Sequence, residues 1–99
     1  MLSQNDIIKF LKDNRYDLIR EYNLSKIGLF GSFARGEQNE KSDIDILVEF
    51  LPETQNIYEK KNSLKELLKK KFSRDVGLCR EKYIKSYART YLENEVIYV

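Results

Sequence analysis

Two aspartates and a glycine-serine pair are the residues of this sequence whose types and spacing could support chemistry. All four lie within residues 26–50, KIGLFGSFARGEQNEKSDIDILVEF, where Gly31 and Ser32 precede Asp43 and Asp45 by ten intervening residues. In an extended strand, residues two apart point to the same side, with Cα atoms roughly 6.6 Å apart. We therefore expect both carboxylates to face one way from a rigid support.

Paired carboxylates on a strand suit a divalent cation. Two anions about 4 Å apart repel by ~1 kcal/mol in water and by ~4 kcal/mol at an effective dielectric near 20, so they need a compensating charge. Mg²⁺ takes oxygen ligands and usually keeps waters and substrate phosphates in its shell. Asp75, which opens a later apolar run, is the candidate third metal ligand and general base, because three carboxylates can hold two ions in phosphoryl transfer. The alternative is that Asp43 and Asp45 cap a strand end in water and Asp75 ends the preceding basic helix.

The glycine-serine pair lies where an apolar run stops and a helical turn is expected. Backbone N–H groups of Gly31 and the hydroxyl of Ser32 can bind a phosphate there, and glycine permits close approach. Arg35, on the same turn, is a further phosphate-binding candidate, with a surface pairing to Glu37 as the equal alternative. A phosphate-binding turn beside a metal site is what a nucleoside triphosphate requires.

Short apolar runs that alternate with helical patterns are expected to position these residues. Helices are predicted from Ser3 onward with a break at Asn14, and then at residues 33–35, 56–72 and 82–94. Strands are predicted at residues 27–30, 43–50, 75–79 and 96–99. Within residues 43–50 the apolar side chains alternate toward the helices, which leaves the aspartates facing away. The pattern predicts an α/β or α+β domain with helices packed on a sheet.

Composition excludes several classes of protein. A chain of 99 residues, 41% hydrophobic and 34% charged, is expected to form one domain over residues 1–99. The net charge of +2 gives no basic footprint, so we expect no direct nucleic-acid contact and no membrane partner. The absence of histidine removes Ser-His and Cys-His catalysis. With no secretory signal pattern at the start, the expected compartment is the cytoplasm.

Three further features are expected to be structural. Cys79, the single cysteine, lies in an apolar run and is predicted to be buried and inert. The lysines at 69–71 fit a solvated helix face better than an RNA contact. Tyrosines recur every four residues along the helix predicted at 82–94, at Tyr83, Tyr87 and Tyr91. Core packing is the default for that stripe, and partner docking is the alternative.

The combination of Gly31-Ser32, a ten-residue spacer and Asp43-Ile44-Asp45 resembles the signature of the nucleotidyltransferase superfamily typified by DNA polymerase beta. The chain length and the segments GSFARG and SDIDILVEF resemble, more narrowly, those of the minimal nucleotidyltransferases. These are the small antitoxin subunits encoded with HEPN-domain toxins. The resemblance implies the mixed-sheet nucleotidyltransferase fold.

The resemblance also implies an activity. A minimal nucleotidyltransferase would use Mg²⁺, with two ions expected, and ATP to transfer AMP to a hydroxyl, with a tyrosine of a HEPN toxin partner as the expected acceptor. Carried onto this sequence, Gly31 and Ser32 bind the triphosphate, Asp43 and Asp45 bind metal, and Asp75 serves as metal ligand and base. The acceptor is expected on another molecule. The alternative is a non-catalytic antitoxin that neutralises its toxin by stoichiometric binding.

Overall fold

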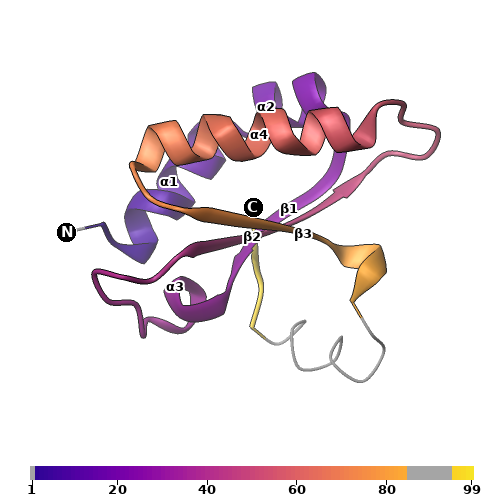
Figure 1. Cartoon of the computed structure of the whole chain (residues 1–99). Coiled ribbons are helices and arrows are strands. Elements are labelled where there is room, and N and C mark those ends of the chain that lie inside the picture. Colours follow the sequence, from indigo (N-terminus) through magenta and orange to yellow (C-terminus); the bar gives the residue numbers. More distant parts are fainter. Residues whose placement is uncertain (1, 85–94) are drawn as a thin grey trace.

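The computed structural model describes residues 2–84 and 95–99 (Figure 1). The elements are, in chain order, α1 (Gln4–Asp13), α2 (Arg15–Tyr22), β1 (Leu24–Phe30), α3 (Gly31–Arg35), β2 (Ile44–Phe50), α4 (Ile57–Phe72), β3 (Val76–Arg80), the 3₁₀ helix η1 (Glu81–Tyr83) and β4 (Ile97–Tyr98).

The four strands form one mixed sheet in the order β3-β2-β1-β4. β1 runs antiparallel to both β2 and β4, whereas β2 and β3 are parallel. Helices α1, α2 and α4 lie over one face of this sheet, and the short helix α3 lies on the other side (Figure 1). The prediction of a small mixed sheet with helices packed on it is confirmed.

The N-terminal helices begin and end where local chemistry dictates. The Ser3 hydroxyl accepts a hydrogen bond from the Asp6 N–H at 3.1 Å, and the Asp6 carboxylate accepts one from the Ser3 N–H at 2.9 Å. This reciprocal pair satisfies two N–H groups that the first turn leaves open. At the far end, the Asn14 side-chain amide donates to the Phe10 carbonyl at 2.9 Å, and α2 begins at the next residue. The predicted cap and break are both confirmed.

The core lies between the sheet and the three covering helices. On β2, Ile44, Ile46 and Val48 are fully buried, and they belong to one core cluster with apolar side chains of α1 and α4. Burying one such side chain contributes roughly 1.5–3 kcal/mol, so a slip of one residue along β2 would be strongly unfavourable. The register therefore keeps Asp45, which alternates with these residues and is half-buried, on the opposite face.

Cys79 is exposed, so the prediction that it is buried was wrong. β3 is an edge strand whose Val76 and Leu78 point into the core, and Cys79 belongs to the alternate set. The helix predicted at 82–94 lies mostly outside the described residues, Tyr87 and Tyr91 included; its described start is the 3₁₀ turn η1, where Tyr83 is exposed.

Residues 2–84 and 95–99 contain no helix with the length and apolar character that a membrane crossing would require.

Candidate active site

Asp45 lies in a slot between two glycines. Its strand neighbours are Phe30 on β1 and Gly77 on β3. A Cβ atom on Gly31 would lie 2.2 Å from Asp45 Oδ2, and a Cβ atom on Gly77 would lie 3.2 Å from Oδ1. Gly31 also has φ +75°, a conformation that side chains disfavour. Glycine at both positions gives the Asp45 carboxylate its room.

The surroundings of Asp45 favour a positive charge. Burial raises the pKa of the Asp45 carboxyl, and the negative charges of Asp43 and Glu95 raise it further, while Arg35 acts in the opposite direction. Asp43 itself is exposed, at the residue before β2. Two neighbouring carboxylates, one in a slot and one open to solvent, are a donor set that suits Mg²⁺ completed by water and phosphate oxygens. The residues present therefore fit the metal that the sequence suggested.

Helix α3 places the glycine-serine pair beside this slot. Phe33 of α3 is fully buried, and the Gln4 side-chain amide of α1 donates to the carbonyls of Phe33 at 3.0 Å and Ala34 at 2.9 Å. Gly36, with φ +73°, ends the helix in the left-handed conformation. These contacts hold α3 to the end of β1, so Gly31 stays next to Asp45.

Arg35 makes two ion pairs. Its Nε donates to Glu37 at 3.0 Å, so the surface pairing considered for Arg35 is present. Its Nη1 also donates to Glu95 Oε1, a contact that no sequence pattern had indicated. The phosphate-binding role of Arg35 remains a prediction.

Glu95 is the residue that sequence reasoning missed. Its Oε1 atom accepts the Arg35 bond and also a hydrogen bond from the Gly31 N–H at 3.0 Å. The side chain is only 9% exposed. Glu95 belongs to no motif and lies 64 residues from Gly31 along the chain. Only the pairing of β4 with β1 brings the two together.

Asp75 is not brought to this slot. Its side chain is 78% exposed and faces Lys69, with 3.8 Å between Nζ and Oδ1. Its carbonyl oxygen accepts from the Ile44 N–H at 3.0 Å, which starts the β2–β3 pairing. The β3 residue beside Asp45 is Gly77, two positions further on. Within the described ranges, no three acidic, cysteine or histidine side chains come close enough to hold a metal together.

Arg74 is a second residue that the sequence did not suggest. Its Nη1 donates to the carbonyl oxygens of Asn39 at 3.0 Å and Ser42 at 2.9 Å, which fixes the loop that leads into Asp43. Its guanidinium also lies over the Phe33 ring, 5.3 Å from the centroid. Arg74 thus connects the two segments that carry Asp43 and Gly31.

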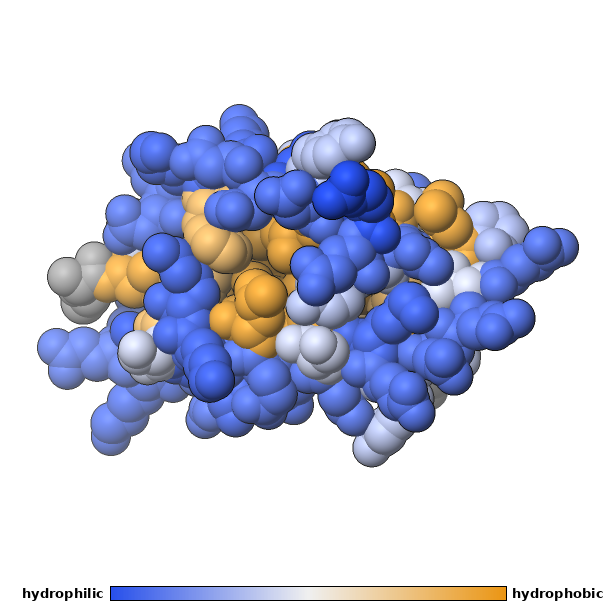
Figure 2. Space-filling view, turned by 90° about the horizontal axis from the view of Figure 1, so that it is seen from above, coloured by the Kyte–Doolittle hydropathy of each residue, from blue (hydrophilic) through white to orange (hydrophobic). Residues whose placement is uncertain are grey.

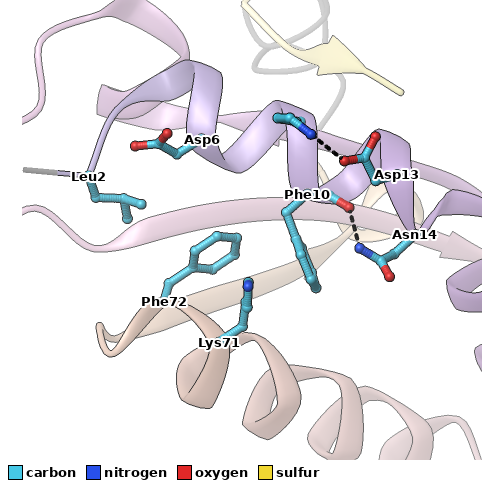
Figure 3. Close-up of a pocket in the computed structure, with 8 residues that line it drawn as sticks. Leu2, Asp6, Phe10, Asp13, Asn14, Lys71 and Phe72 are labelled. Atoms are coloured by element: carbon cyan, nitrogen blue, oxygen red, sulfur yellow. Dashed lines mark hydrogen bonds and ion pairs between the residues drawn. The ribbon is translucent and has the colours of Figure 1, made fainter.

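A separate hollow lies on the helical side of the sheet, between α1 and the end of α4 (Figure 3). Phe10 and Phe72 meet edge to face there with centroids 5.3 Å apart, while Lys9 pairs with Asp13 at 2.8 Å. Figure 2 views this side from above and shows apolar side chains between the helices with hydrophilic ones around them. The hollow is remote from Asp45, which faces the other way, and it is not part of the candidate site.

Comparison with known proteins gives concordant matches. A family model described as "Nucleotidyltransferase domain" matches residues 5–99. A Methanocaldococcus jannaschii protein described as a candidate protein adenylyltransferase is 37% identical over 100 residues, covering all of both chains. "Protein adenylyltransferase MntA" of Thermococcus cleftensis is 34% identical, covering 100% of this chain and 98% of that protein. A crystal structure of a toxin-antitoxin with AMP-PNP superposes with a TM-score of 0.67 at 28% identity, covering 98% of this chain and 72% of that one.

Proposed function

Because the chain belongs to the nucleotidyltransferase domain family, we propose that it transfers AMP from ATP to a hydroxyl group of a partner protein, and so acts as an antitoxin. Relatives of matching length are named protein adenylyltransferases, which supports the enzyme class. The similar chain crystallised with AMP-PNP, an ATP analogue, supports ATP as the substrate, and its toxin-antitoxin context supports a toxin as the acceptor.

The observation that carries the proposal is the slot at Asp45. A half-buried carboxylate flanked by Gly31 and Gly77, with Asp43 beside it, has no packing purpose in the core that β2 builds. Asp43 and Asp45 would hold Mg²⁺, two ions in our proposal, which when bound offsets triphosphate charge and favours displacement at phosphorus. The Gly31 N–H and the Ser32 hydroxyl would bind triphosphate oxygens, with Arg35 as a further contact.

The reaction itself requires little covalent work from the protein. The acceptor oxygen forms a bond to the α-phosphorus of ATP, the bond from that phosphorus to the bridging oxygen breaks, and pyrophosphate leaves with the electron pair. The acceptor proton must pass to a base. We propose Asp75 as this base from the family resemblance alone. The geometry adds no support, because the Asp75 side chain faces Lys69 and not the slot. Positioning by α3 and β2 would supply most of the rate enhancement.

The partner we propose is a HEPN-domain toxin, with one of its tyrosines as the acceptor. The acceptor would arrive on that second molecule, while residues 1–99 act as a single catalytic domain in the cytoplasm. A net charge of +2 offers no footprint for direct contact with nucleic acid.

Transfer of radiolabel from α-labelled ATP tests the proposal, with Mg²⁺ present and the proposed HEPN-domain toxin as acceptor. The double variant Asp43→Asn, Asp45→Asn should abolish label on the partner, whereas Glu40→Gln, at an exposed acid of the neighbouring loop, should leave it unchanged. Chelation of Mg²⁺ should also abolish it. If no label appears while the two proteins bind and the partner is inhibited, the non-catalytic antitoxin replaces the enzyme.

A further inference from the structure

One carboxylate already occupies the groups that the proposed function assigns to the triphosphate. Glu95 Oε1 accepts from the Gly31 N–H at 3.0 Å and from Arg35 Nη1. A carboxylate oxygen and a phosphate oxygen ask for the same partners, namely N–H donors and a guanidinium. The Gly31 N–H has one hydrogen to donate, so it cannot serve both acceptors fully.

The geometry points to Glu95 as an internal competitor of the nucleotide, a side chain that must leave Gly31 and Arg35 before a triphosphate can bind them. This inference rests on the proposed function, because it takes ATP as the ligand of the Gly31 turn. It adds a regulatory step: the free chain holds its phosphate-binding groups closed, and its apparent affinity for ATP is reduced by the fraction of molecules in which Glu95 is seated.

The strand that carries Glu95 into place is fixed by a close approach. β4 pairs with β1 through Gly28 opposite Tyr98, and the Val99 N–H donates to the Ile27 carbonyl at 3.0 Å. A Cβ atom on Gly28 would lie 2.8 Å from Val96 Cγ1 and 3.0 Å from the Ile97 carbonyl oxygen. Because residue 28 is glycine, residues 96–98 can lie this close to β1. That approach places Glu95 beside Gly31 and Arg35.

The charges around Glu95 allow a bound nucleotide to displace it from Gly31 and Arg35. With Glu95 bonded to Gly31 and Arg35, its negative charge adds to that of Asp43 in repelling the Asp45 carboxylate, and Arg35 offsets part of this repulsion. A magnesium-bound nucleotide brings positive charge to the aspartates and its own phosphates to Gly31. Binding can then displace Glu95 into water at a modest cost, because an exposed carboxylate is well solvated.

The test is the affinity for ATP with Mg²⁺, measured by calorimetry on the intact chain and on two charge-neutralising variants. Glu95→Gln removes the competing charge, and we expect about tenfold tighter binding, roughly the effect of losing one charge-assisted hydrogen bond. Glu37→Gln is the matched control, because the Glu37 carboxylate also pairs with Arg35, whereas the Gly31 N–H donates to Glu95. We expect its affinity for ATP to match that of the unaltered chain.

A second variant tests the same position of Glu95 by shifting the backbone that carries it. Gly28→Ala should displace β4 and so tighten ATP binding without altering any charge at the site, provided circular dichroism shows the native fold. If that variant does not fold, Glu95→Gln alone decides the question.

Each outcome separates the inference from the proposed function. Equal or weaker binding by Glu95→Gln overturns the inference, and the proposed function stands if label transfer still occurs. Tighter binding without any label transfer supports the inference for nucleotide binding and leaves the transferase proposal refuted. If neither the unaltered chain nor Glu95→Gln binds ATP, both fail together.

Discussion

Gly77 lies directly beside Asp45 across the parallel β2–β3 pair, and a Cβ atom at Gly77 would be 3.2 Å from Asp45 Oδ1. The strand position that could have offered a further carboxylate to the slot instead provides empty space. The proposed site therefore depends on the missing side chains of Gly31 and Gly77 as well as on the aspartates.

We expect Gly77→Ala to lower the rate of AMP transfer while leaving the fold intact. The added methyl would push the Asp45 carboxylate by a few tenths of an ångström, whereas alanine in a strand has less unfolded-state freedom to lose and should hold stability within about 1 kcal/mol. Label transfer and urea denaturation measure the two effects. Cys79→Ala, on the same strand but further from Asp45, serves as control. Equal rates for the two variants would show that the space at Gly77 does not matter for activity.

Gly31→Ala should be far more damaging, because its Cβ would lie 2.2 Å from Asp45 Oδ2 and its φ is +75°. We expect transfer to be lost and stability to fall by about 1–3 kcal/mol. Gly36→Ala is the matched control: its φ is +73°, but nothing lies within 4 Å of the added atom. That variant should lose about 1 kcal/mol of stability and keep its activity. Loss of activity in both would assign the effect to α3 as a whole.

Asp45→Asn should stabilise the metal-free protein. Because burial and the Asp43 charge raise the pKa of Asp45, its ionised form opposes folding at neutral pH, and an amide removes that cost. We expect the Tm to rise by roughly 1–4 °C, equivalent to a fraction of a kcal/mol. Mg²⁺ should raise the Tm of the unaltered chain and have little effect on the variant. A lower Tm for metal-free Asp45→Asn would contradict this account.

Glu49 should make stability depend on pH in the acidic range. Burial alone would raise its pKa, but hydrogen bonds from the Phe50 N–H, from Arg80 and from the Lys82 N–H lower it overall. The stabilisation is therefore complete above the unfolded pKa of about 4.3 and disappears as the pH falls through the lower folded value.

The lowered pKa of Glu49 implies that Glu49→Gln lowers the free energy of unfolding by about 1–2 kcal/mol at pH 7. The variant weakens the charged hydrogen bond that Arg80 Nη2 donates to Glu49 at 2.7 Å. The difference from the unaltered chain should shrink toward zero near pH 3. Urea denaturation at both pH values measures it, with Glu59→Gln at an exposed position as the control. A difference independent of pH would show that packing, not ionisation, is involved.

The sequence predicted the local features well, because local rules govern them. Asn14 breaks the first helical region through a bond to a carbonyl four residues earlier, and the alternation around Ile44 and Ile46 turned Asp45 to the open face. The spacing of Gly31 and the aspartates was enough to predict that Gly31 and Asp45 lie together, since the β1–β2 pairing brings Phe30 opposite Asp45.

The remaining features depend on contacts between distant residues. Glu95 lies 64 positions from Gly31 in the chain, and no periodicity in the sequence predicts their contact. The position of Asp75 depended on where β3 begins, and the strand placed Gly77 beside Asp45 instead. Cys79 was misjudged because an apolar run on an edge strand still has two faces, of which only one meets the core.

The exposure of Cys79 gives the molecule a built-in reporter position. It is the single cysteine of the chain, it is open to solvent, and it lies two residues beyond Gly77 on the strand that borders Asp45. A thiol-reactive fluorophore can therefore be attached at one defined place without removing or adding any other cysteine. Its emission would follow events at the carboxylate slot in real time, in the native sequence.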